Sequence, residues 1–207
     1  LLFKVPKSLA LLEDELYQLR PLLHAQTHIV GAGMVRDVHT STLDLCKRLI
    51  GPTHTSLAQK KARLIFSTLD TNLEVGPSPY PTAYALRGTE FTLENAANVF
   101  SRQRLDNGTR LLLRHIPSLS GTVQIADLGC GNGVIGLVAA ERSPQAELIF
   151  VDESFMAVSS ARANFRRAFR GRSSRFAVGD GLESCPPNSL DLVLCNPPFH
   201  RQQAIDQ

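Results

Sequence analysis

The second half of the chain contains four short, mainly apolar runs separated by longer polar or helical segments. The runs cover residues 123–128, 148–151, 176–178 and 190–195. Such runs are typical of parallel strands, because these strands are buried on both faces of their sheet. After the first run, Val134, Leu137 and Val138 recur at helical spacing. The alternation of strand and helix predicts an α/β fold with a doubly wound, Rossmann-like sheet.

Residues 1–70 alternate in a similar way. Strand-like runs cover residues 2–5, 28–32 and 61–66, with apolar residues at helical spacing between them. Ser8 is expected to cap the first helix, and Ser41 or Thr42 the second. The segment has no glycine-rich cofactor turn and no catalytic set of residues. It is therefore interpreted as a scaffold without ligand, and its scattered basic residues as a solvated edge rather than an RNA-binding face.

A proline-rich segment, Gly76-Pro77-Ser78-Pro79-Tyr80-Pro81, separates the two halves. Closely spaced prolines disfavour both helix and strand. We therefore expect a first domain over residues 1–75, a linker over 76–88 and the front part of a second domain over 89–207. Both ends are expected to be truncated, because the chain begins on a strand-like run and a complete doubly wound domain needs further strands.

The first apolar run of the second half ends in a glycine turn, Asp127-Leu128-Gly129-Cys130-Gly131-Asn132-Gly133. Glycine suits such a turn, because the dihedral angles are unusual and the backbone must approach a ligand closely. Gly131, Gly133 and Gly136 formally match a dinucleotide-binding fingerprint. Asp127 would repel a pyrophosphate, however, and it favours a ligand with a cationic amino-acid end. S-adenosylmethionine, with its ammonium, sulfonium and ribose, is such a ligand.

Two further strands are predicted to end in an acidic residue. Asp152 follows the second apolar run, where its carboxylate can accept hydrogen bonds from both hydroxyls of a ribose. A helix cap is the alternative role for this residue. Asp180 follows the third run and is expected to accept a hydrogen bond from an adenine amine.

The fourth run ends in Asn196-Pro197-Pro198-Phe199. A ring-conjugated amine is a poor nucleophile, because its lone pair is delocalised. The side-chain oxygen of Asn196 and the backbone carbonyl of Pro197 can accept both amine hydrogens, and the prolines hold these acceptors in place. Phe199 offers a flat surface on which a flipped base can stack. A rigid turn is the alternative, but it does not explain why this motif follows a glycine turn and two strand-end acids in order.

Two other segments leave alternatives open. Phe100 and Asp106-Asn107-Gly108 are interpreted either as a loop folded over the cofactor or as a turn before a packing helix. The predicted helix over residues 155–169 is expected to bury Phe155, and it carries a face of arginines. That face is read either as a phosphate-binding surface or as an ordinary solvated one.

Composition and charge narrow the class of protein. The chain has 207 residues, 43% hydrophobic and 20% charged, with a net charge of +3. It shows no membrane-span or signal-peptide pattern. The four cysteines form no C-x-x-C pair, which argues against a metal site or a disulfide framework and favours the cytoplasm.

Particular motifs extend this interpretation by resemblance. Asp-Leu-Gly-Cys-Gly-Asn-Gly at 127–133 resembles the first motif of the Rossmann-like S-adenosylmethionine-dependent methyltransferases. Together with segments 100–109, 151–154 and 196–200, it resembles the ribosomal RNA guanine-N2 methyltransferases, with the large-subunit enzyme favoured over the small-subunit one. That family has two tandem methyltransferase-like domains, the first degenerate and without cofactor. The resemblance implies that residues 1–75 are the back half of the degenerate domain, with Val5-Pro6-Lys7-Ser8 in the place of the catalytic motif.

The function expected from these features is S-adenosylmethionine-dependent methylation of a guanine N2 amine in ribosomal RNA. The expected catalytic residues are Asn196, Pro197 and Phe199. The expected cofactor-binding residues are Asp127, Gly129, Gly131, Gly133, Asp152, Asp180 and Asn196. The alternatives are methylation of a protein glutamine or of another nucleobase amine, a nicotinamide-dependent oxidoreductase, and an RNA-binding fragment without activity.

Overall fold

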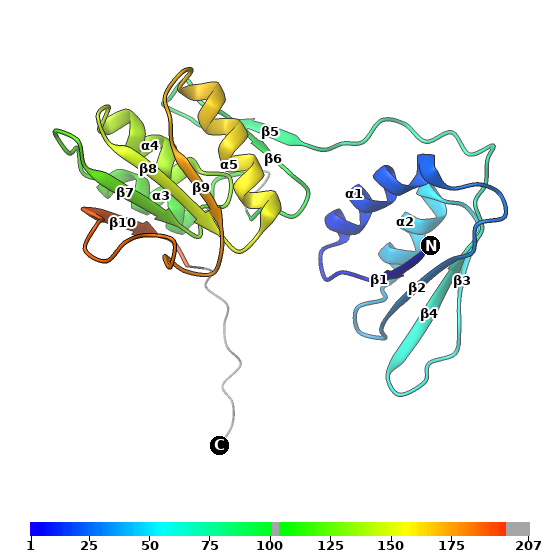
Figure 1. Cartoon of the computed structure of the whole chain (residues 1–207). Coiled ribbons are helices and arrows are strands. Elements are labelled where there is room, and N and C mark those ends of the chain that lie inside the picture. The colour runs from blue at the N-terminus through cyan, green and yellow to red at the C-terminus, as the bar shows by residue number, and fades with distance from the viewer. Residues whose placement is uncertain (101–103, 198–207) are drawn as a thin grey trace. The chain divides into compact units, whose positions relative to one another are not determined.

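The computed structural model describes residues 1–100 and 104–197. The chain divides into two compact units, Leu1–Tyr80 and Pro81–Gln207, coloured blue to cyan and green to red respectively in Figure 1. Each unit contains its own sheet and its own apolar core. The two units are therefore described one at a time.

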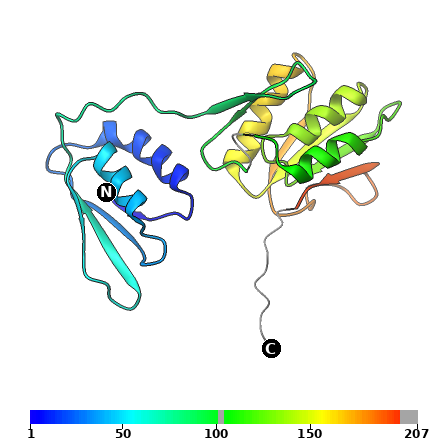
Figure 2. The same cartoon turned by 180° about the vertical axis from the view of Figure 1, so that it is seen from behind.

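The first unit is a mixed four-stranded sheet with two main helices. Its elements in chain order are β1 (Leu2–Lys4), α1 (Leu9–Leu19), the 3-10 helix η1 (Arg20–Leu22), β2 (Ile29–Met34), α2 (Thr40–Leu49), β3 (Thr53–Thr55) and β4 (Ala62–Ser67). The strand order is β1-β2-β4-β3. β1 and β2 are parallel, whereas β4 runs antiparallel to both of its neighbours. Figure 2 shows the same arrangement from behind.

The helix starts of this unit test two sequence predictions. The Ser8 side chain accepts a hydrogen bond from the Leu11 backbone N–H at 3.3 Å, so its predicted capping role is confirmed. The predicted cap of α2 by Ser41 or Thr42 is wrong, because the helix already begins at Thr40, and its cap position is occupied by His39 without a side-chain hydrogen bond.

Arg20, in the 3-10 helix η1, forms hydrogen bonds with the end of α2 and with the segment after β4. Its guanidinium donates to the backbone carbonyls of Leu49, Ile50, Asp70 and Leu73, at 2.8 to 3.3 Å. A guanidinium presents five donors in a fixed plane, so one side chain can satisfy several loop carbonyls at once. Arg20 thus fixes the segment after β4 against the end of α2.

The second unit contains a fully parallel four-stranded sheet and a small hairpin. Its elements are β5 (Thr82–Ala85), β6 (Thr92–Asn95), α3 (Asn107–His115), β7 (Gln124–Leu128), α4 (Val134–Arg142), β8 (Glu147–Asp152), α5 (Phe155–Ala168), β9 (Arg175–Val178) and β10 (Leu192–Cys195). The sheet order is β10-β7-β8-β9, with every pair parallel. All four strands predicted for this half are present, and the predicted Rossmann-like α/β class is confirmed.

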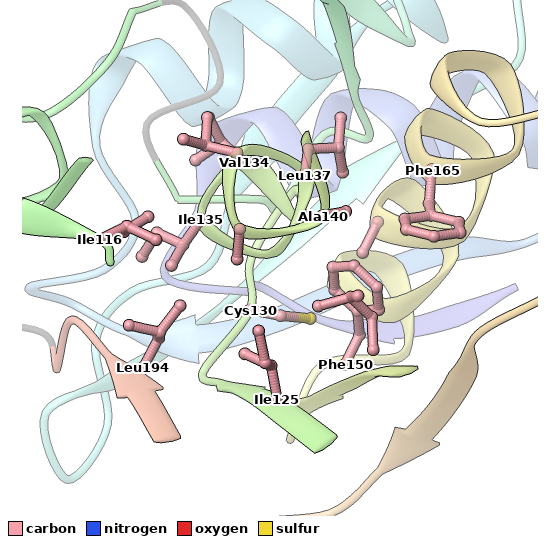
Figure 3. Packing of buried hydrophobic residues seen from close by; sticks show 14 of the residues in the cluster. Ile116, Ile125, Cys130, Val134, Ile135, Leu137, Ala140, Phe150, Phe165 and Leu194 are labelled. Atoms are coloured by element: carbon pink, nitrogen blue, oxygen red, sulfur yellow. The ribbon is translucent and has the colours of Figure 1, made fainter. Parts of the chain in front are cut away.

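The core of the second unit lies between the sheet and α4, which packs against α3 and α5. Figure 3 shows Val134, Ile135 and Leu137 on α4, above Phe150 on β8 and beside Phe165 on α5. The rings of Phe150 and Phe165 meet edge to face, with 5.4 Å between their centroids. α4 is apolar on all sides from Val134 to Ala140, and these residues are all buried, so packing holds the start of the helix at the end of β7.

The β5–β6 hairpin lies before the parallel sheet in the sequence and docks on α5. The Asn164 side chain accepts a hydrogen bond from the Glu94 N–H and donates one to the Glu94 carbonyl, both at 2.8 Å. The amide thereby pairs with the hairpin backbone as a neighbouring strand would. β5 lies inside the range expected to be a linker, after the last of the closely spaced prolines.

None of the helices within residues 1–100 and 104–197 has both the length and the hydrophobicity that a membrane span requires. The same part of the chain contains no group of three or more histidine, cysteine or acidic side chains placed to hold a metal ion.

Candidate cofactor and catalytic site

The candidate site lies at the carboxyl ends of β7 and β10. From β7 the chain proceeds to β8 and β9 on one side and then crosses back to place β10 on the other side. In doubly wound sheets, this reversal of strand order opens a crevice at the carboxyl ends of the two strands. Leu194 pairs with Asp127 and Cys195 with Leu128, so Asn196 follows β10 at the level of Gly129.

The glycine turn after β7 contains three residues with positive φ, namely Gly129 (+68°), Gly131 (+54°) and Gly133 (+81°). A Cβ atom at Gly129 or Gly131 would meet nothing within 4 Å, so both glycines face open space. At Gly133 it would lie 2.9 Å from the Cβ of Ala161 on α5. Gly129 and Gly131 therefore border the candidate ligand space, whereas Gly133 also allows α4 to begin close to α5.

Asp127 is completely buried at the end of β7. Its Oδ2 accepts a hydrogen bond from the Gly136 N–H at 2.8 Å, whereas Oδ1 is buried without a hydrogen-bond partner among the described residues. Burial, together with the nearby Asp152 carboxylate, raises the pKa of Asp127 to about 8 despite the Gly136 hydrogen bond. A buried, unsatisfied carboxylate oxygen costs free energy, and a cationic ligand would offset that cost.

Asp152 lies at the end of β8 and accepts two backbone hydrogen bonds. One comes from Gly131 N–H at 2.9 Å and the other from Ser154 N–H at 2.8 Å. The side chain that caps α5 is that of Ser154, not that of Asp152. Asp152 therefore holds the glycine turn against β8, and each carboxylate oxygen keeps a further lone pair for a ligand.

Asp180 is exposed and lies two residues beyond β9. The Gly179 N–H donates to the Asp152 carbonyl at 3.0 Å, so the end of β9 lies beside the end of β8. Asp180 and Asp152 are thus at the same edge of the sheet. The roles predicted for the cofactor-binding residues remain predictions.

The Asn196 side chain lies in a hydrogen-bonded cluster with the start of α3. Its Nδ2 lies 3.0 Å from Asp106 Oδ2 and 2.9 Å from Thr109 Oγ1. Asp106 is also the N-cap of α3, because its carboxylate accepts hydrogen bonds from the Gly108 and Thr109 N–H groups. Asp106 therefore begins the helix directly, Asn107 and Gly108 form its first turn, and Phe100 is exposed. This first turn contacts the catalytic candidate, and whether the segment also folds over the cofactor stays a prediction.

Pro197 is exposed and directly follows Asn196. Phe199 lies outside the described residues, so its predicted stacking role remains a prediction. Phe155, expected to be buried, is 77% exposed at the first position of α5. That expectation was wrong, because the buried face of α5 begins only at Ala157 and continues through Val158, Ala161 and Phe165.

Sequence reasoning did not identify the buried contact between the hairpin and the glycine turn. The Asn132 side chain donates to the Tyr84 hydroxyl at 3.2 Å and to Asn95 Oδ1 at 2.8 Å. Asn132 also accepts a hydrogen bond from the Val134 N–H at 3.1 Å. An asparagine between two glycines was the available signal, but its partners lie tens of residues away in the sequence.

The arginines in and after α5 fall into two groups. Arg172 donates to the carbonyls of Ala140, Ser143 and Ala146, and Arg167 forms a 2.6 Å ion pair with Glu94. Arg166 and Arg170 are exposed. Arg172 and Arg167 therefore stabilise the fold through contacts within this unit. The phosphate-binding interpretation applies to the exposed arginines that lack such contacts among the described residues, such as Arg166 and Arg170.

The parallel sheet, the reversal of strand order beside β7 and the glycine turn define a Rossmann-like domain of the methyltransferase class. The family model of the methyltransferase small domain matches residues 90–207, and the chain belongs to this family. A second family model, the RLMG N-terminal domain, matches residues 1–71.

Similar curated proteins are named as ribosomal RNA methyltransferases. A relative from Streptomyces avermitilis, named ribosomal RNA large subunit methyltransferase G, is 54% identical over 99% of this chain and 55% of its own length. A relative of the same name from Pseudomonas aeruginosa is 52% identical over 99% of the chain and 54% of its own length. The chain therefore spans about half the length of these curated relatives. The predicted resemblance to the large-subunit enzyme is confirmed.

A solved structure supports the fold. The 16S rRNA N2 G1207 methyltransferase RsmC of T. thermophilus, solved with AdoMet and guanosine, aligns with a TM-score of 0.77 and 21% identity. The alignment covers 98% of this chain and 56% of that one.

Proposed function

We propose that the protein to which this chain belongs methylates the exocyclic N2 amine of a guanine in large-subunit ribosomal RNA, with S-adenosylmethionine as methyl donor. The observation that carries the proposal is the position of the Asn196 amide. It lies at the tip of β10, beside the glycine turn of β7, at the reversal of strand order where sheets of this class bind their ligands.

The residues at the end of β7 fit this cofactor. Gly129 and Gly131 leave open space beside the backbone, and Asp127 has a buried oxygen without a partner among the described residues. Asp127, Gly129, Gly131 and Gly133 would hold the amino-acid end, Asp152 the ribose and Asp180 the adenine amine. When bound, S-adenosylmethionine supplies an electrophilic methyl group attached to a sulfonium.

The chain's own contribution is to hold the target amine in position. Asn196 Oδ1 and the Pro197 carbonyl would each accept one amine hydrogen, which increases electron density on the nitrogen and fixes its direction. Phe199 would stack on the flipped base. No covalent enzyme intermediate is required for this role.

The first unit is proposed to be the back half of a degenerate methyltransferase-like domain. Its glycines on β2 are used for packing, since a Cβ at Gly31 would lie 2.6 Å from the Phe3 ring and one at Gly33 would lie 2.8 Å from Val38. The segment after β1 is Val5-Pro6-Lys7-Ser8, which lacks an amide side chain. Its proposed role is that of a scaffold that binds no cofactor.

The proposal is tested by a methyl-transfer assay on the complete protein with purified large-subunit RNA, small-subunit RNA and a glutamine-containing peptide as separate substrates. We expect N2-methylguanine in the large-subunit RNA alone. Asn196→Ala should reduce turnover by about 100-fold or more, because a preorganised acceptor is lost, while cofactor affinity stays near the wild-type value.

Other outcomes of the same assay assign the alternatives. Methylation of the peptide or of another base amine would replace the substrate, and binding of RNA without turnover would leave only an RNA-binding role. Loss of cofactor binding in Asp152→Ala supports the cofactor site, whereas unchanged affinity would overturn it.

A further inference from the structure

We infer that Asp106, Gly108 and Thr109 at the start of α3 are positioning residues that fix the orientation of the Asn196 amide, so that its oxygen faces the target amine. The inference rests on the proposed function and extends it. It adds the start of α3, which is distant in the sequence, to the motif after β10. Without these α3 residues, the direction of the Asn196 side-chain oxygen would not be fixed.

The first step is the direction of the amide. The Asn196 nitrogen lies 3.0 Å from Asp106 Oδ2 and 2.9 Å from Thr109 Oγ1, and the Thr109 hydroxyl donates to the same Asp106 oxygen at 2.6 Å. The hydroxyl hydrogen is therefore already used, so both neighbours of the amide are acceptors. Rotating the amide by 180° would bring Asn196 Oδ1 against two acceptor oxygens, which is strongly unfavourable.

The second step is the charge of Asp106. Burial opposes its ionisation, but hydrogen bonds from the Thr109 hydroxyl and backbone and from Gly108 outweigh burial and lower the pKa of the Asp106 carboxyl. The group is thus a carboxylate at neutral pH. A hydrogen bond from an amide N–H to a carboxylate polarises the amide and makes its oxygen a better acceptor, which favours a more nucleophilic target amine.

The third step is the space around the amide oxygen. A Cβ atom at Gly108 would lie 2.8 Å from Asn196 Oδ1, closer than a real side chain allows. Gly108 lies in the first turn of α3 and does not have a positive φ. Backbone conformation therefore does not require glycine at this position, and the close approach of the amide oxygen does.

The Thr109 pair of variants separates a positioning role from a structural one. Thr109→Val keeps the shape of this buried side chain but removes its hydroxyl, and Thr109→Ser keeps the hydroxyl but loses a methyl group. We expect kcat to fall about 10-fold in Thr109→Val and to recover most of that loss in Thr109→Ser. The KM for RNA and the Kd for S-adenosylmethionine should stay within about twofold in both.

Gly108→Ala gives an independent test, because turnover should fall without a loss of stability. Alanine is favoured over glycine in helices, so the midpoint of thermal unfolding should stay the same or rise. Turnover should nevertheless fall by about 10-fold or more, because the new methyl group displaces Asn196 Oδ1. A purely structural role of this turn predicts that activity follows stability.

Asp106→Asn completes the series. Asparagine caps helices as well as aspartate does, so α3 is retained, but the carboxylate that orients and polarises Asn196 is lost. We expect kcat to fall about 10- to 100-fold with cofactor affinity unchanged.

All variants are measured in the complete protein beside the wild type. If the wild type methylates RNA while Thr109→Val, Gly108→Ala and Asp106→Asn keep kcat within twofold, the positioning role is overturned and the proposed function remains. A wild-type protein that binds S-adenosylmethionine but methylates no substrate overturns the proposed function, and the inference with it.

Discussion

At Asp127, burial favours the protonated carboxyl group, whereas a cationic ligand would favour the ionised one. Its carboxyl group is fully buried, and the pKa of Asp127 is raised to about 8 by burial and by Asp152. A carboxyl group with a raised pKa binds its proton more tightly in the folded than in the unfolded state. The folded protein therefore loses stability as the pH rises from the ordinary carboxyl range towards 8.

This linkage gives a first prediction about pH. The free energy of unfolding of the ligand-free protein should decrease between about pH 4 and pH 8, and Asp127→Asn should flatten that slope. Binding of a cationic cofactor near Asp127 favours its ionised form, so binding at pH 7 should release protons. Calorimetry in buffers of different ionisation enthalpy measures this release, and equal release in wild type and Asp127→Asn would contradict the assignment.

The glycine turn gives a second prediction with a matched control. Gly131 and Gly121 both have positive φ, at +54° and +81°, and a Cβ at either meets nothing within 4 Å. Alanine at either position should cost about 1 kcal/mol of stability from backbone strain. Only Gly131→Ala should also weaken S-adenosylmethionine binding, because Gly121 lies in a loop before β7. Titration calorimetry and thermal unfolding separate the two effects.

Individual residues of the site were predictable where a local pattern carries the chemistry. The glycine turn and the strand-end residues Asp127, Asp152 and Asn196 lie at one edge of the sheet, as parallel strands require. The contact between Asn196 and Asp106 could not be predicted, because it joins residues 90 positions apart. The same holds for Asn132 and Tyr84, which are brought together by the docking of a hairpin.

Strands were predicted best where consecutive residues along the strand are apolar and buried. β7, β8 and β10 are apolar runs, and each was expected. β3, with the sequence Thr-His-Thr, and β6, with Thr-Leu-Glu-Asn, have no such run. They form because a neighbouring strand or helix provides hydrogen-bond partners, and short strands of this kind have no local signature.

The arginines in α5 and in the segment after it give a third prediction. It distinguishes an arginine that stabilises the fold from one that is free to bind RNA phosphates. Arg172 donates to three backbone carbonyls at the end of α4 and just after it, and burial lowers the pKa of its guanidinium. Arg172→Ala should reduce stability by about 2–3 kcal/mol, because these carbonyls lose their donors. Chemical denaturation with far-UV circular dichroism measures this loss.

Exposed Arg166 is the control for this substitution. Arg166→Ala should change stability by less than about 0.5 kcal/mol. If the exposed face binds RNA phosphates, the same substitution should weaken RNA binding and decrease the slope of log affinity against log salt by about 0.7 to 0.9. An unchanged salt slope would show that this face is only solvated.

At the scale of the whole molecule, the chain contains two units with separate apolar cores. A ligand that binds one unit stabilises that unit by mass action, by about 2.7 kcal/mol at a concentration 100 times its Kd. S-adenosylmethionine should therefore raise the unfolding temperature of the second unit alone.

Differential scanning calorimetry with and without cofactor tests this fourth prediction. Asp152→Ala, which removes the predicted ribose contact and the acceptor for the Gly131 N–H, should abolish the shift. A cofactor-dependent shift of the first unit would instead indicate a second binding site and contradict the proposal that this unit is degenerate.

The position of β10 has a consequence for folding. β7 is an inner strand only because β10, the last strand in the described part of the sequence, pairs along its free side. Until β10 is available to pair, β7 has one row of unpaired backbone groups, and such an open edge invites pairing with other chains. A chain that ends before residue 190 should therefore aggregate more readily than the same chain with β10 included, which light scattering during refolding measures.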